Sequence, residues 1–135
     1  MRAVSIRLLK PAITPNTKWV VLNFPNNPTG AVCSRAEMRE IADVLLAHPH
    51  VFVMADDVYE HLTYDGFGFC TVAEVEPKLK ERTLTVNGAS KAYAMTGWRV
   101  GFCGGPKPMV AAMMNMQGQI GSGISTISQA AAVAA

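Results

Sequence analysis

A single lysine stands among small and aromatic residues in the stretch NGASKAYAMTGWRVG, which covers residues 87–101. A lysine amine can condense with a carbonyl group when its neighbours lower its pKa from about 10.4. Lys91 is therefore a candidate nucleophile, and Arg99 offers the planar fork that suits a phosphate group. The small residues at 88–90 allow a bulky group to approach the backbone. Taken alone, the stretch favours a surface lysine and arginine beside a tight turn.

Two earlier runs end in polar residues, NFPNNPTG at 23–30 and ADDVYE at 55–60. A residue before proline avoids the helical region, so the turn presents the Asn27 amide just after an apolar run. Asp56 directly follows a second apolar run. Open α/β sheets bind ligands at the carboxyl ends of their strands. Both polar runs are therefore predicted to lie at a ligand-binding edge.

The three runs, in this order, resemble the motifs of class I and II pyridoxal-phosphate-dependent aminotransferases, the aspartate aminotransferase type. The resemblance extends over essentially all 135 residues, although proteins of the family are far longer. It implies an α/β fold that is part of the three-layer, mostly parallel-sheet large domain of fold type I transferases. Residues 1–135 are then expected to be a middle part of that large domain, without the small domain.

The resemblance implies a separate task for each matched residue. Lys91 is expected to form a Schiff base with pyridoxal phosphate and, once freed, to move the substrate proton. Asp56 matches the aspartate that keeps the pyridine nitrogen protonated. Tyr59 and Asn27 match the residues that hydrogen-bond the ring oxygen of the cofactor.

The phosphate group is expected to bind Arg99, with Ser90 as a weaker candidate. Gly88 stands where other members carry a serine, so one phosphate-binding hydroxyl is expected to be missing. Asp57 is expected to have a structural role.

The implied function is transamination, the transfer of an amino group between an amino acid and a 2-oxo acid. Lyases and synthases of the same fold share the lysine site, and no residue here separates them from transaminases. An inactive truncated chain is a third possibility, because the family's glycine-containing phosphate loop, its ring-stacking aromatic and its substrate-binding arginine have no counterpart here. Full-length relatives are expected to be homodimers.

The elements that must position these residues follow from the hydrophobic pattern. Residues 19–24 and 51–55 predict buried parallel strands. Between them, the SRAE run at 34–37 predicts a capping box. The helix behind it repeats apolar residues on one face, namely Met38, Ile41, Ala42, Leu45 and Leu46. Further elements are predicted as a short helix end at 8–13, a polar helix at 72–80, strands at 83–86 and 98–103, and helices from 106 and from about 125.

The composition excludes several classes of partner. A net charge of +2 with 16% charged residues provides no basic stripe for nucleic acid or an anionic membrane. No apolar run approaches the roughly 20 residues of a membrane span, so a cytoplasmic protein is expected. Cys33, Cys70 and Cys103 lack paired spacing and are expected to be reduced thiols in the core, and the histidines lack metal-ligand spacing.

Overall fold

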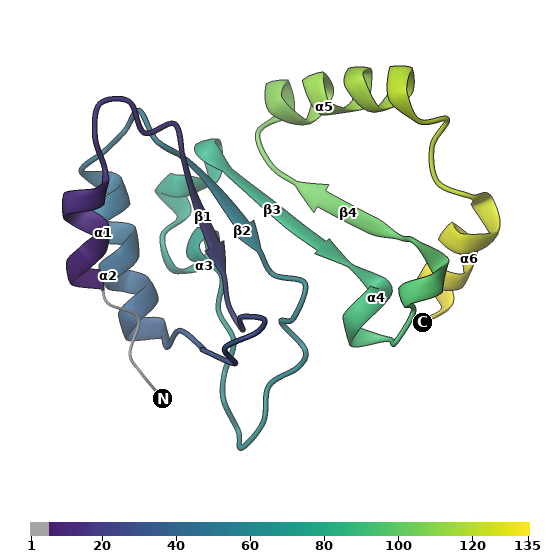
Figure 1. Ribbon diagram of the computed structural model, residues 1–135, viewed down its shortest axis with the longest axis horizontal. Helices are drawn as coiled ribbons and strands as arrows, with labels where there is room; N and C mark the ends of the chain where they lie inside the picture. Colours follow the sequence, from purple (N-terminus) through teal and green to yellow (C-terminus); the bar gives the residue numbers. More distant parts are fainter. Residues whose placement is uncertain (1–5) are drawn as a thin grey trace.

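The computed structural model describes residues 6–135, which form one four-stranded sheet in the order β1-β2-β3-β4 (Figure 1). The strands are β1 (Trp19–Asn23), β2 (Phe52–Asp56), β3 (Thr83–Gly88) and β4 (Gly101–Gly104). The first three run parallel, and β4 runs antiparallel to β3. The fold is therefore α/β with a mostly parallel sheet, as predicted.

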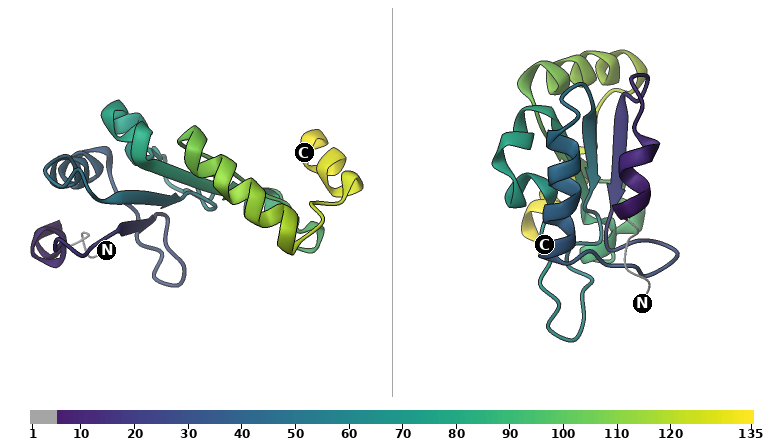
Figure 2. Two further views of the ribbon diagram at one scale, coloured as in Figure 1. Left: turned by 90° about the horizontal axis from the view of Figure 1, so that it is seen from above. Right: turned by 90° about the vertical axis from the view of Figure 1, so that its left-hand side faces the viewer.

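Helix α2 (Arg35–Leu46) connects β1 to β2 and begins at the predicted capping box. The Ser34 N–H donates to Glu37 Oε2 at 2.8 Å, and the Glu37 N–H donates to Ser34 Oγ at 3.3 Å. These bonds satisfy two backbone donors that a helix start otherwise leaves free. The apolar face is confirmed, since α2 buries Met38, Ile41, Ala42 and Leu45. Helix α1 (Ile6–Ala12) packs beside α2 (Figure 2).

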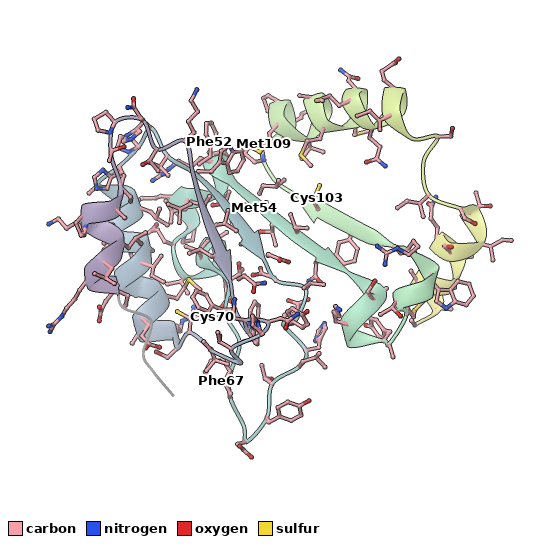
Figure 3. All side chains as sticks on the ribbon, viewed as in Figure 1. Phe52, Met54, Phe67, Cys70, Cys103 and Met109 are labelled. Carbon is pink, nitrogen blue, oxygen red and sulfur yellow. The ribbon has the colours of Figure 1, made fainter. Side chains whose placement is uncertain are left out.

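The main core lies between α2 and one face of β1 and β2, where Leu22, Val53 and Ala55 are all at most 8% exposed. The prediction that both strands are buried is wrong for the opposite face. Trp19 and Val21 are 43% and 57% exposed, and Phe52 is 40% exposed. Successive side chains of a strand point to opposite faces, and this second face of β1 stays open in the described part of the chain. Phe52 and Met54 of β2, labelled in Figure 3, are the register partners of Trp19 and Val21 and lie on this same face of the sheet.

The prediction of one continuous polar helix at 72–80 is wrong. The segment divides into α3 (Val72–Val75) and a 3-10 helix, η1 (Pro77–Arg82). Pro77 has no N–H to continue the α-helical pattern, so the helix ends before it. The predicted strand at 98–103 begins later, at Gly101, because a 3-10 turn, η2 (Thr96–Trp98), and a left-handed Arg99 precede it.

Helices α5 (Lys107–Ile120) and α6 (Thr126–Ala134) follow β4, as predicted from the sequence. They lie toward the end of the sheet opposite α1 and α2 (Figure 2). Both helices lie within the described residues, and neither contains a buried residue. A small cluster of Ala89, Met95 and Val100 is the only core on this side among residues 6–135. Within the same residues, no helix combines the length and apolarity needed to cross a membrane.

The three cysteines are free thiols, as expected, and Cys33 and Cys70 are buried in the main core. The expected core location is wrong for Cys103, which is half-buried in β4. Burial and the neighbouring Glu37 carboxylate raise the pKa of the Cys33 thiol to about 12. This thiol is therefore protonated and unreactive near neutral pH.

Candidate active site

The carboxyl ends of β1, β2 and β3 meet at one edge of the sheet, the lower edge in Figure 1. Asn23, the last residue of β1, pairs in register with Asp56, the last residue of β2. Asp56 in turn pairs with Val86 of β3, five residues before Lys91. The parallel register thus brings the runs at 23–30 and 55–60 to one edge, as the sequence predicts, and it brings the lysine stretch to the same edge.

Three of the predicted site residues lie together at this edge. The Asn27 side-chain amide donates to the Tyr59 hydroxyl over 3.2 Å. The Lys91 Nζ lies 5.6 Å from the centre of the Tyr59 ring, within the range of a cation–π contact. An amine, a phenol and an amide that converge from three segments can bind a carbonyl-bearing ligand and hydrogen-bond an oxygen beside it.

Asp56 is held by a residue that the sequence analysis did not single out. Asn23 Nδ2 donates to Asp56 Oδ2 at 3.1 Å and to the Asp56 carbonyl oxygen at 3.3 Å. Asn26 Nδ2 donates in turn to Asn23 Oδ1 at 2.8 Å. Both asparagines belong to the NFPNNPTG run. The predicted strands, 19–24 and 51–55, have other bounds than β1 and β2, so aligning them does not pair Asn23 with Asp56.

The sequence also did not predict a second pair of an asparagine and a carboxylate, formed by Asn87 and Glu60. Asn87 Nδ2 donates to Glu60 Oε1 at 2.6 Å, and Asn87 Oδ1 accepts the Gly88 N–H at 2.7 Å. Glu60 follows Tyr59, and Asn87 precedes the lysine segment. The pair therefore connects the segment that carries the phenol to the segment that carries the amine.

Asp57 is only 6% exposed, and its main-chain N–H donates to the Val86 carbonyl at 2.9 Å. Burial raises the pKa of its carboxyl to about 6, and the nearby Glu60 and Asp56 carboxylates act in the same direction. The hydrogen bond from the Asp57 main chain to Val86 continues the pairing of β2 with β3 beyond the end of β2. This position is compatible with the structural role predicted for Asp57.

The structure does not bring Arg99 into contact with the other candidates. Its side chain is exposed and donates to the Thr96 carbonyl at 3.0 Å. Ser90 lies half-buried in α4 (Ala89–Ala92), one residue before Lys91. A Cβ at Gly88 would lie 2.9 Å from the Val100 carbonyl oxygen, so a serine there would require the backbone near β4 to move. The close approach of β4 explains why glycine occupies this position.

Residues 3–135 match the family described as "Aminotransferase class I and II". The chain belongs to this family. Proteins of this family use pyridoxal phosphate, and the family assignment confirms the resemblance inferred from the three motifs. Structural similarity to aspartate aminotransferases also confirms the fold type I assignment.

The chain is 60% identical to an aspartate aminotransferase of Rhizobium meliloti strain 1021 over 127 residues, 94% of this chain and 31% of that protein. It is 55% identical to a probable aspartate/prephenate aminotransferase of Rickettsia bellii, over 94% of this chain and 32% of the relative. A crystal structure of the Rhizobium meliloti aspartate aminotransferase superposes with a TM-score of 0.93 at 56% identity, over 97% of this chain and 33% of that one. The chain thus spans about a third of the length of these relatives.

The side chains of this aminotransferase family member fit pyridoxal phosphate at the carboxyl edge. The bond between Asn27 and Tyr59 places two groups that can donate to one oxygen side by side, with the Lys91 amine over the same phenol ring. Asp56 keeps a carboxylate at the same edge. An amine, two neighbouring donors and a carboxylate match the aldehyde, ring oxygen and ring nitrogen of the cofactor.

Proposed function

We propose that the chain is the cofactor-binding part of the large domain of a pyridoxal-phosphate-dependent aminotransferase. Such an enzyme moves an amino group between an amino acid and a 2-oxo acid. The observation that carries the proposal is the meeting of Lys91, Tyr59 and Asn27 beside Asp56 at the carboxyl edge. The family assignment and the names of the relatives support it.

Bound pyridoxal phosphate supplies an electron-withdrawing ring that stabilises negative charge on a carbon joined to its imine. Lys91 would hold the cofactor through its amine, and the same amine, when free, would serve as the base that moves the substrate proton. Tyr59 and Asn27 would hold the ring through its oxygen, since their polar groups lie 3.2 Å apart. One amine thus serves for binding and for proton movement.

Asp56 would hold the ring nitrogen, since a carboxylate beside it favours the protonated nitrogen. Arg99 would hold the phosphate with the N–H groups that its bond to the Thr96 carbonyl leaves free. Ser90 is a second donor to the phosphate from α4.

Aspartate is the amino donor that we propose, because the Rhizobium relative is named an aspartate aminotransferase. The names of the similar proteins do not favour the lyase or synthase alternative. A homodimer and a cytoplasmic location remain proposals that rest on the family resemblance and on the composition.

An assay with aspartate and 2-oxoglutarate tests the proposal on the chain loaded with pyridoxal phosphate. The expected products are glutamate and oxaloacetate in equal amounts, lost in Lys91→Ala and retained in Lys107→Ala, a control at another exposed lysine. Ammonia and a keto acid without glutamate, from folded protein that retains the cofactor, would instead indicate a lyase.

A further inference from the structure

We propose that Asn23 is a positioning residue that fixes the Asp56 carboxylate for the ring nitrogen of the cofactor. The inference rests on the function proposed above and adds a residue to it. Asn23 and Asp56 end neighbouring parallel strands and are partners in the register. Their side chains therefore lie on the same face of the sheet, where Asn23 Nδ2 meets Asp56 Oδ2 at 3.1 Å.

Asn23 is the last member of a chain of hydrogen bonds that runs in one direction. The Ala31 N–H donates to Thr29 Oγ1 at 3.2 Å, and the Thr29 hydroxyl donates to Asn26 Oδ1 at 2.7 Å. Asn26 Nδ2 then donates to Asn23 Oδ1 at 2.8 Å. The Thr29 main-chain N–H, which can only donate, also reaches Asn26 Oδ1 at 3.4 Å, so the Asn26 amide turns its nitrogen toward Asn23. The Asn23 amide is oriented in the same way, with its nitrogen toward Asp56.

Every donor in this chain points toward the carboxylate, and hydrogen bonds arranged in series polarise one another. Donors to an ionised carboxylate stabilise the charged form. Asn23 also bonds only one carboxylate oxygen, and no hydrogen bond to Asp56 Oδ1 is found among residues 6–135. Asn23 thus sets the plane of the carboxylate and leaves the other oxygen free for a protonated ring nitrogen.

The same turn supports both sides of the site. The Asn26 N–H donates to the Ala31 carbonyl at 2.9 Å, and the Gly30 N–H donates to the Asn26 carbonyl at 2.8 Å. These bonds fix the turn from which Asn27 reaches Tyr59. One turn therefore orients a donor for the ring oxygen and, through Asn23, the carboxylate for the ring nitrogen.

Nitrogen NMR of bound pyridoxal phosphate labelled with ¹⁵N in the ring tests the inference without relying on turnover. In Asn23→Leu, which keeps the size but loses the polar groups, we expect the ring-nitrogen signal to move toward the unprotonated position. We also expect a roughly tenfold lower kcat in the aspartate and 2-oxoglutarate assay, with KM changed less. Asn115→Leu, at an exposed asparagine of α5, is the matched control.

Thr29→Val is a second variant, at an exposed position three hydrogen bonds away from Asp56, and it tests the inference even if Asn23→Leu does not fold. We expect a smaller shift in the same direction. Ring-nitrogen signals at the wild-type position in each folded variant would overturn the role of Asn23. Wild-type protein that holds no cofactor on Lys91 would instead overturn the proposed function itself.

Discussion

The two sides of the candidate site rest on very different amounts of core. Asn27 and Tyr59 follow β1 and β2, and Asp56 ends β2; the two strands share a core of twelve buried residues in the described part of the chain. Lys91 follows Ala89, whose cluster contains three buried residues over the same range. Apolar burial is the main stabilising term in folding, so the segment with the amine is the less stable side.

The site therefore joins a well-packed region, α1 to η1 with β1 and β2, to a sparsely packed region, α4 to α6 with β4. The polar contact between Asn87 and Glu60 lies at the junction of the two regions. This arrangement implies that packing in the first region sets overall stability. The position of Lys91 depends more on the few contacts of the second region.

The largest expected effect comes from the well-packed region. Leu45 is fully buried in α2, so we expect Leu45→Ala to lower the free energy of unfolding by about 2–5 kcal/mol. Met116 is 65% exposed in α5, and Met116→Ala should change it by less than about 0.5 kcal/mol. Urea unfolding followed by circular dichroism measures both. Equal losses in the two variants would contradict the difference between the regions.

The well-packed region also contains a buried carboxyl, whose effect depends on pH. The pKa of Asp57 is raised from 3.8 to about 6, mainly by burial. Between these two pH values the unfolded chain loses this proton more readily than the folded chain does. The free energy of unfolding therefore falls as the pH rises, and the full loss is reached above about pH 6. We expect the free energy of unfolding of Asp57→Asn to rise, relative to wild type, by up to about 3 kcal/mol as the pH goes from about 4 to about 7.

Urea unfolding at both pH values measures this gain. Asp65→Asn, in the exposed loop after Tyr59, is the matched control. The same pH dependence in the two variants would show that burial of Asp57 is not its cause.

Sequence reasoning succeeded where the signal was local and failed where it depended on neighbours. The capping box at Ser34 and Glu37 acts within four residues, and the structure contains it. The exposure of Val21 was not predictable from its own strand, because the pattern does not show what covers each face. Asn23 was missed for a related reason, since its contact with Asp56 depends on the register of two strands 33 residues apart.

The site residues divide in the same way. The convergence of Asn27 and Tyr59 with Lys91 follows from motifs that each end a parallel strand. Arg99 is different, because its left-handed backbone, with φ of 55°, helps to set where β4 begins and where the side chain lies. That conformation was not indicated by the residue type, since only glycine adopts it readily.

A smaller effect is expected from the contact between the two regions. Asn87→Ala removes a hydrogen bond to the Glu60 carboxylate, and we expect a loss of about 1–2 kcal/mol. Amide hydrogen exchange should rise in residues 88–104 more than in α2. Asn115→Ala in exposed α5 is the control, and an even rise over both regions would argue against a junction at Asn87.

The smallest effect is expected at the helix start in the well-packed region. Ser34→Ala removes the side chain that accepts the Glu37 N–H, so we expect a loss of about 1 kcal/mol in the free energy of unfolding. Ser128→Ala, within α6 and away from its start, should cost less. A larger loss at Ser128 would show that the sparsely packed region contributes more stability than its burial indicates.

The central claim is that the sheet edge places Lys91 where it holds the cofactor, and chemical labelling tests it most directly. The chain is incubated with pyridoxal phosphate, freed of excess cofactor, reduced with borohydride and mapped by peptide mass spectrometry. The account predicts label on Lys91, absent in Lys91→Ala and unchanged in Lys107→Ala. Folded protein, verified by circular dichroism, with no label or with label spread over other lysines would contradict it.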